Sequence, residues 1–328
     1  MSLAQYQRKF RALYVNTTRG RRSPHKVCML LAMLDMARGG ALKANRIVYG
    51  PQILERYNRY FDAVRAEQDH PSAYFPFFHL GGDLRAIERG GDRLRSFWHL
   101  RPLPGHEAEL ARMSTARSHR DIIEVIECAT LDPELFELLH SGSNIEVLAE
   151  TLAQHWFDRG LEDLAAVANQ GRQISLYERQ LRAFEPARLM AHDLPEAIRN
   201  PAFRRVVVEN YDYRCAASGL RIVLPDGTAM VEAAHIHPFS EAADDDPRNG
   251  LALTPDMHWA MDKNLIAPDA DFVWRVSRAL DDRVPDYQRL TGLDGRKLFL
   301  PGEKRLWPKR ESLAWRIERL NMGYRRAL

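Results

Sequence analysis

The chain has few cysteines and no long apolar run, and both absences limit what it can be. Its three cysteines, Cys28, Cys128 and Cys215, stand far apart among 328 residues and form no Cys-x-x-Cys pair. Because disulfide frameworks and four-cysteine zinc sites need paired cysteines, we expect neither, and no structural zinc. The start, MSLAQYQRKF, has no apolar core of signal-peptide length, and no stretch approaches a membrane span. We therefore expect a cytoplasmic protein with no membrane partner.

A strong net charge is also missing. The chain has 47 Lys and Arg against 44 Asp and Glu, which gives a formal net charge of +3. Any affinity for nucleic acid must therefore come from local basic patches and not from the overall charge. A composition with 45% hydrophobic and 28% charged residues is typical of a soluble globular protein. The length fits about two domains of roughly 100–200 residues each.

Apolar residues at helical spacing predict a mainly helical N-terminal domain over residues 1–160. Residues 27–40 are typical of a buried helix that ends at Gly39-Gly40, and Ser23-Pro24 is a suitable start, with Ser23 as N-cap and Pro24 at the first helical position. Residues 69–83 are dense in aromatics and proline, as in a hydrophobic plug or a recognition loop. Further helices are expected at 51–65, 119–128, 132–140 and 145–157, and a strand within 91–105.

A charged, helical stretch follows and then the pattern changes. Residues 161–196 contain little Pro, Gly or Ser, so we interpret them as a partly helical connector and not as a disordered linker. Residues 197–328 form the C-terminal domain. They begin with a helix at 201–210 and continue with two β-rich runs joined by Pro225-Asp226-Gly227, which predicts a hairpin just before His235. The fold class is therefore α+β, and the chain ends with a helix at 309–322.

Two histidines and an asparagine in this domain have a spacing that suggests chemistry. His235 ends a short apolar run, Asn249-Gly250 lies fourteen positions later, and His258 lies nine positions after that. Each residue is ordinary alone. Hydrolysis of a phosphodiester needs a base for water, neutralisation of the developing charge and stabilisation of the leaving oxygen. Neutral imidazole is a suitable base near pH 7, so we predict His235 in that role, with Asn249 and His258 as its catalytic partners and as metal ligands. His237 is left open as a phosphate contact.

The segments YDYRCAASG, VEAAHIHPFS and DDPRNGLALTPDMHWAMDKNLI resemble the bacterial HNH endonucleases of restriction type, over about residues 201–280. The resemblance implies a ββα-metal nuclease domain that cleaves double-stranded DNA with Mg²⁺ or Mn²⁺. It departs from the family pattern in two ways. Ala234 stands where many relatives have an acidic or histidine ligand, and the paired cysteines that brace many relatives are missing.

The N-terminal region resembles, less specifically, the sulfur-binding domain of nucleases that cut phosphorothioate-modified DNA. The matching features are His25-Lys26 at the start of an apolar helix, the run from Phe75 to Leu80, and the run from Phe97 to Leu100. Sulfur is larger and less strongly hydrated than oxygen, so an apolar cup favours it. The resemblance implies that Phe75 and Pro76 form the cup, although Phe75 in place of Tyr loses a hydroxyl. The surrounding DNA contacts would be Arg22, His25, Lys26 and Arg101. The alternative is that residues 75–80 are simply core.

These features favour a modification-dependent restriction endonuclease whose N-terminal domain selects the DNA. Ala234 keeps open a DNA-binding or regulatory protein with an HNH fold that does not cleave. A third reading is a defence nuclease whose N-terminal region senses a signal other than DNA. A single HNH module cuts one strand, so double-strand cleavage would call for a homodimer or for two monomers that meet at a site.

Overall fold

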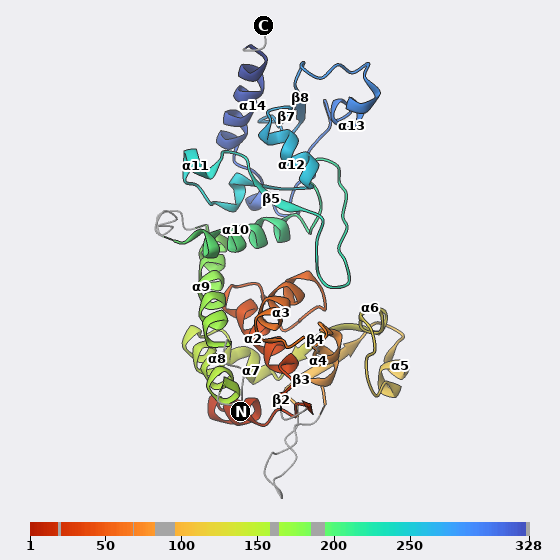
Figure 1. Ribbon diagram of the computed structural model, residues 1–328, viewed down its shortest axis with the longest axis vertical. Coiled ribbons are helices and arrows are strands. Elements are labelled where there is room, and N and C mark those ends of the chain that lie inside the picture. The colour runs from red at the N-terminus through yellow and green to blue at the C-terminus, as the bar shows by residue number, and fades with distance from the viewer. Residues whose placement is uncertain (19–20, 68, 83–95, 158–163, 185–193, 326–328) are drawn as a thin grey trace, which may run out of the picture. The chain divides into compact units, whose positions relative to one another are not determined.

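The computed structural model describes residues 1–18, 21–67, 69–82, 96–157, 164–184 and 194–325 (Figure 1). Helices dominate these residues, and their β-strands form four two-stranded antiparallel pairs. The predicted α+β class is confirmed. The chain divides into two compact units. Unit 1 comprises residues 1–176 with 224–228, and unit 2 comprises residues 177–223 with 229–328.

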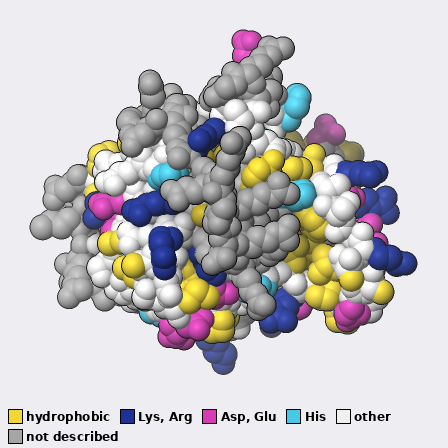
Figure 2. Space-filling model, turned by 90° about the horizontal axis from the view of Figure 1, so that it is seen from below, with side chains coloured by type: hydrophobic (Ala, Val, Ile, Leu, Met, Phe, Trp, Pro, Cys, Tyr) yellow, Lys and Arg dark blue, Asp and Glu magenta, His cyan; other side chains and the backbone are white. Residues whose placement is uncertain are grey.

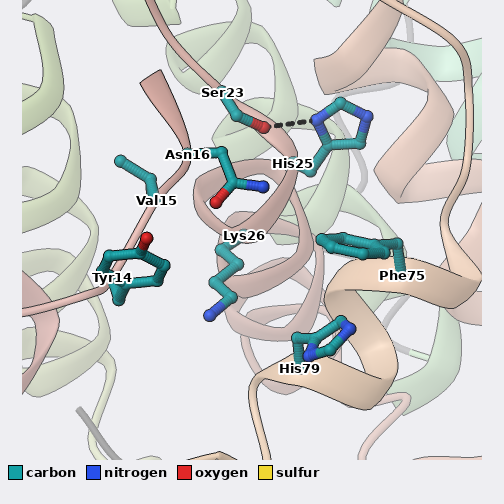
Figure 3. A pocket seen from close by; sticks show the side chains of 8 residues that line it. All are labelled: Tyr14, Val15, Asn16, Ser23, His25, Lys26, Phe75 and His79. Carbon is teal, nitrogen blue, oxygen red and sulfur yellow. Dashed lines mark hydrogen bonds between the residues drawn. The ribbon is translucent and has the colours of Figure 1, made fainter. Parts of the chain in front are cut away.

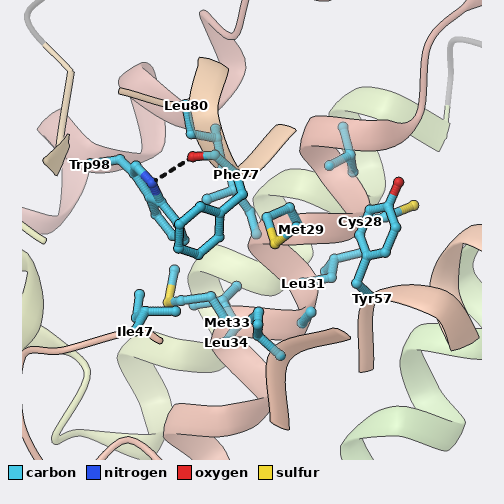
Figure 4. Close-up of a cluster of buried hydrophobic side chains, with 14 of the residues drawn as sticks. Cys28, Met29, Leu31, Met33, Leu34, Ile47, Tyr57, Phe77, Leu80 and Trp98 are labelled. Atoms are coloured by element: carbon cyan, nitrogen blue, oxygen red, sulfur yellow. Dashed lines mark hydrogen bonds between the residues drawn. The ribbon is translucent and has the colours of Figure 1, made fainter. Parts of the chain in front are cut away.

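Unit 1 is built around one helix that is apolar on every side. The helices of this unit are α1 (Leu3–Arg11), α2 (His25–Arg38), α3 (Pro51–Val64), α4 (Tyr74–His79), α5 (Glu107–Arg112), α6 (His119–Val125), α7 (Pro133–Leu138) and α8 (Gly142–Phe157). In α2 every residue from Val27 to Met36 is buried, as expected of a central helix, and α3, α4 and α8 pack around it. Trp98 and Phe77 close one side of this core, where the Trp98 indole N–H donates to the Phe77 carbonyl (Figure 4). The helix predicted at 27–40 is thereby confirmed, with Gly39 as its C-cap, but its N-cap is Pro24 and not the expected Ser23.

The helix expected over 119–128 is wrong in its last part. Helix α6 ends at Val125, and Ile126–Leu131 form strand β4, which pairs with β3 (Trp98–Pro102). The side chains of β4 lie mostly in the core, and β3 supplies backbone partners that a helix would not need. Tertiary pairing therefore overrides a local pattern that is compatible with a helix. A second, very short pair in unit 1 joins β1 (Thr17–Thr18) to β2 (Arg21–Arg22).

Helix α9 (Leu164–Ala183) lies within the predicted connector and contributes residues to both units, with unit 2 starting at Tyr177. Other parts of that connector, residues 161–163 and 185–193, fall outside the described residues. No helix in the described ranges is long and apolar enough to span a membrane. One face of the molecule shows basic, acidic and hydrophobic side chains interspersed on its described surface, in keeping with the small net charge (Figure 2).

Unit 2 contains short strands between helices. Its elements are α10 (Glu196–Asn210), β5 (Glu232–His235), α11 (Phe239–Ala242), the 3₁₀ turn η3 (Pro247–Asn249), β6 (Gly250–Leu253), α12 (Pro255–Asp262), β7 (Ile266–Pro268), β8 (Trp274–Val276), η4 (Pro285–Tyr287), α13 (Gln288–Thr291), η5 (Lys304–Leu306) and α14 (Arg310–Arg325). Helix α12 packs on β5, β6 and β7, while α10 packs on β5 and β6. The strands and α12 therefore form the ββα arrangement that the sequence predicts.

The strand pairing within that arrangement differs from the prediction. The hairpin expected before His235 is reduced to one isolated bridge between Val223 and Ala229. The partner of β5 is instead β6, which follows Asn249, and the register places His235 opposite Gly250. A side chain at Gly250 would not fit, because a Cβ there would lie 2.6 Å from a Val207 methyl and 2.8 Å from the Phe203 ring. The Asn-Gly pair is thus a point of close approach to α10 as well as a turn.

Candidate active site

His235 ends strand β5 with its ring held on two sides. Its Nε2 lies 2.8 Å from a carboxylate oxygen of Asp245, and the ring stacks in parallel on Phe203 with 4.0 Å between centroids. A carboxylate can only accept a hydrogen bond, so Nε2 carries the proton and Nδ1 carries the lone pair. The side chain remains 20% exposed. In the neutral form of the His235 ring, Nδ1 is therefore the nitrogen that can accept a proton.

Asp245 is the first of two residues of this site that the sequence did not predict. Its side chain is fully buried, and besides His235 it accepts hydrogen bonds from the Tyr177 hydroxyl and the Arg199 guanidinium, each at 3.0 Å. A buried carboxylate is tolerated only when it is paired and hydrogen-bonded, which these three partners achieve. The run Asp244-Asp245-Asp246 has the composition of a polar loop. Three successive acids just before the motif asparagine were the signal that could have identified it.

Asn249 is fully buried and its amide serves the backbone of the loop after His235. The amide oxygen accepts from the His237 N–H at 3.0 Å, and the amide nitrogen donates to the carbonyls of His237 and Asp244 at 2.9 Å. These three bonds close the loop that connects the two strands of the pair. They explain why an amide is needed here, since it both donates and accepts. That Asn249 also gives an oxygen to a metal stays a prediction.

His258 lies on α12 between two carboxylates. Its Nδ1 is 2.7 Å from Glu232 and its Nε2 is 3.5 Å from Asp262. Glu232 accepts a hydrogen bond from Nδ1–H, so in the neutral ring the lone pair is on Nε2, on the side of Asp262. Metal-binding histidines commonly have one N–H fixed by a carboxylate in this way. Glu232 was also missed. It shares a strand face with Ala234, so the two-residue alternation of β5 could have revealed it.

The site offers imidazole and carboxylate groups of the kind that bind a divalent metal, but few of them lie close together. The described residues contain no group of three or more His, Cys, Asp and Glu placed to hold a metal ion. The imidazole Nε2 of His258 and the carboxylate of Asp262 are nevertheless adjacent, and imidazole and carboxylate are both common ligands. An ion held by these two side chains would take its other ligands from water and from a phosphate of the substrate. Ala234 is fully buried and contributes no donor.

The backbone that carries His235 is held by helix α14. The buried guanidinium of Arg316 donates to the carbonyls of Ile236 at 2.7 Å and of His235 and Met261 at 3.3 Å. Burial lowers the pKa of Arg316 from its usual value. The ring of His237 stacks on Trp315 from the same helix, with 4.1 Å between centroids. The planar guanidinium thus ties the carbonyls of His235 and Ile236 to that of Met261 on α12, which leaves the end of β5 little freedom to move.

In unit 1 a cavity of about 170 Å³ brings together three of the six residues predicted to contact DNA (Figure 3). They are His25, Lys26 and Phe75, and the remaining lining residues are Tyr14, Val15, Asn16, Ser23 and His79. The other three lie elsewhere. Pro76 is buried within α4, the Arg22 guanidinium lies over the Trp156 ring, and Arg101 is exposed on β3.

Lys26 is the cation of this cavity. Its ammonium forms no ion pair or hydrogen bond with any residue that the structure describes, and burial lowers its pKa to about 8. His25 is already satisfied, because its Nε2–H donates to the His70 carbonyl and its Nδ1 accepts from the Ser23 hydroxyl. Burial lowers the pKa of His25, and burial together with the Lys26 charge lowers that of His79. The cavity therefore combines one cation that has no partner among the described residues with two imidazoles of lowered pKa and the apolar side chains of Val15 and Phe75.

One family model matches a segment in the C-terminal part of the chain. Residues 215–267 match the family model of the HNH endonucleases. No curated protein sequence matches the chain. Among solved structures the chain is similar to the modification dependent TagI restriction endonuclease, at 20% identity and a TM-score of 0.29. That match covers 39% of this chain and 40% of the other, so the chain spans less than half of that protein. The chain thus carries an HNH endonuclease domain at residues 215–267, within which His235, Asn249 and His258 lie.

Proposed function

We propose that the protein is a DNA endonuclease that hydrolyses phosphodiester bonds with His235 as general base. The hydrogen bond between His235 Nε2 and buried Asp245 is the observation that supports it most directly. It fixes the tautomer in which Nδ1 accepts a proton, and the nearby carboxylate stabilises the imidazolium that then forms. Nδ1 takes a proton from the attacking water, while the Phe203 ring keeps the imidazole in one plane.

His258 and Asp262 are the side chains that would hold a divalent ion such as Mg²⁺ or Mn²⁺. When bound, the ion supplies positive charge at the scissile phosphate and at the leaving oxygen. Glu232 keeps the proton of His258 on Nδ1 so that Nε2 faces Asp262. Asn249 holds the loop after His235 and is the further predicted ligand. The absence of a three-ligand group among the described residues favours, as the second candidate, an HNH-fold DNA-binding protein that does not cleave.

The cavity around Lys26 supports selection of modified DNA by unit 1. At about 170 Å³ it is smaller than the roughly 300–1,000 Å³ that drug-sized ligands occupy, so it suits one chemical group and not a whole nucleoside. The Lys26 ammonium, which no described residue pairs, attracts a backbone anion, and the apolar side chains of Phe75 and Val15 favour a weakly hydrated atom beside that charge. A phosphorothioate has both properties. We therefore assign phosphorothioate-modified double-stranded DNA as the substrate.

The experiment that tests this function is nicking of phosphorothioate-containing and unmodified plasmid, side by side, with Mg²⁺, Mn²⁺ or a chelator. Metal-dependent cleavage of the modified plasmid supports the proposal. Binding without cleavage in every metal supports the second candidate. Failure of the chain to bind either DNA supports a nuclease that responds to a different signal. Cleavage of both strands at one site, with a rate that rises with the square of protein concentration, would indicate that two copies act together.

Lys26→Met should weaken binding of phosphorothioate duplex by about tenfold or more, because it removes a partly buried cation from the proposed anion site. The free-state pKa of about 8 adds a pH dependence. In the unmodified protein the ammonium loses its proton as pH rises through that value, so affinity falls from pH 7 to pH 9. Fluorescence anisotropy with a His235→Ala background measures both effects without cleavage.

The matched control for Lys26 is Lys43→Met, which removes an exposed lysine from the same unit. This variant should keep both the affinity and its decline above pH 8. The Lys26→Met protein should bind weakly at every pH between 7 and 9. Equal affinity and an equal pH profile for Lys26→Met and the parent protein would rule out the cavity as the anion site.

A further inference from the structure

The carboxylate of Asp245, which orients His235, has two further side-chain partners, Arg199 and Tyr177. Helix α9 ends in unit 2, and there the hydroxyl of Tyr177 donates to one oxygen of Asp245 at 3.0 Å. The other oxygen of Asp245 lies 2.8 Å from His235 Nε2. Tyr177 is almost completely buried, at 2% exposure. Burial, reinforced by the Asp245 charge, raises the pKa of Tyr177 well above its usual range, so the hydroxyl keeps the proton that it donates.

We propose that Tyr177 is a positioning residue of the catalytic centre, whose hydroxyl holds the Asp245 carboxylate in the rotation that keeps the His235 proton on Nε2. The inference rests on the proposed role of His235 and adds a residue outside the segment 215–267 that the family model covers. No pattern in the sequence points to Tyr177, because it lies on the connector helix, 68 positions before Asp245.

One partner compensates the charge of Asp245, and another fixes the orientation of its carboxylate. Arg199, on α10, lies 3.0 Å from both carboxylate oxygens and also covers the Phe239 ring, with 3.5 Å to the ring centroid. It compensates the buried charge without selecting one oxygen over the other. Tyr177 contacts only the oxygen opposite His235, so it acts on rotation about the carboxylate axis. A carboxylate held by Arg199 alone could turn and lose the alignment with Nε2.

The test uses the full chain with Tyr177→Phe, which removes one oxygen atom and keeps the ring in the core. We expect cleavage of modified DNA to have a kcat about tenfold lower with an unchanged KM, because the variant loses a hydrogen bond to a charged group that is remote from the DNA. The second readout is ¹⁵N NMR of the His235 ring, which distinguishes the two tautomers directly. In the parent protein Nε2 should carry the proton, and in Tyr177→Phe the two tautomers should be mixed.

Tyr211→Phe is the matched control. Tyr211 is also buried in unit 2, but its hydroxyl has no hydrogen-bond partner among the described residues. Its loss should change neither kcat nor the ring spectrum. A Tyr177→Phe protein with the parent kcat and a pure Nε2–H tautomer would overturn the inference. Because the NMR readout needs no cleavage, it separates this outcome from a failure of the proposed function, in which the parent protein does not cut DNA at all.

Discussion

Replacement of His235 by alanine should lower the rate of DNA cleavage by about 10²–10⁴-fold, the usual contribution of a positioned general base. The variant loses the only side chain in unit 2 that we place at the water as a proton acceptor. DNA binding should be unchanged, because the cavity around Lys26 lies in unit 1. The removed ring is partly exposed and makes one side-chain hydrogen bond, so the folded state should persist. Single-turnover cleavage and anisotropy measure the two quantities separately.

His140→Ala is a suitable control for this prediction. His140 is an exposed histidine of unit 1 whose side chain is 60% accessible, so its loss should leave both rate and binding unchanged. Small-molecule rescue offers a second check. Added imidazole should restore part of the activity of His235→Ala, because the vacated space beside Phe203 and Asp245 can accept the ring. A His235→Ala protein that cleaves at the parent rate would remove His235 from the mechanism.

Asp245→Asn should also lower cleavage by about 10²–10⁴-fold, although the side chain keeps its size. The amide can present its NH₂ group to His235, which then needs its lone pair on Nε2 and its proton on Nδ1. Nδ1 would no longer accept a proton from water. The substitution also leaves the Arg199 guanidinium without its carboxylate in a buried position, which costs about 3–5 kcal/mol of stability. Single-turnover kinetics and thermal unfolding would show both losses.

The neighbouring substitution Asp246→Asn separates the loss of cleavage rate from the loss of stability. Asp246 is also buried and is paired with Arg248 and Lys309, but not with His235. These partners and their hydrogen bonds lower the pKa of Asp246 despite its burial. Its contribution to stability is therefore present above the ordinary carboxyl pKa and is lost as the pH falls through the lower folded-state value. Asp246→Asn should lower the melting temperature and keep most of the cleavage rate at neutral pH. Equal cleavage rates for Asp245→Asn and Asp246→Asn would contradict the role of Asp245.

The local spacing in the sequence predicts three motif residues and the helices that surround them. His235 ends β5, Asn249 ends η3 and His258 lies within α12, and each stands in a short segment with a clear local pattern. Helix α2 was predicted well because its apolar residues and its terminal glycines indicate the same boundaries. These features depend on neighbours within a few positions.

The supporting residues depend on contacts between distant segments and could not be predicted in the same way. Asp245 reaches His235 because β5 pairs with β6, whereas the sequence favoured a hairpin within residues 220–236. Tyr177 reaches Asp245 from a helix assigned to a connector. Glu232 and His258 meet because α12 crosses the strand pair. In unit 1, Tyr14 and Asn16 complete the cavity with Lys26, although neither belongs to the motifs that suggested it.

The central claim is that unit 1 selects modified DNA for cleavage by the HNH domain. The most direct measurement is the initial cleavage rate of two duplexes with one sequence, one carrying a single phosphorothioate and the other a phosphate at that position, in Mg²⁺ or Mn²⁺. We predict that the phosphorothioate duplex is cleaved and the unmodified duplex is not, and that Lys26→Met removes this preference. Equal cleavage of both duplexes by the parent protein would contradict the account.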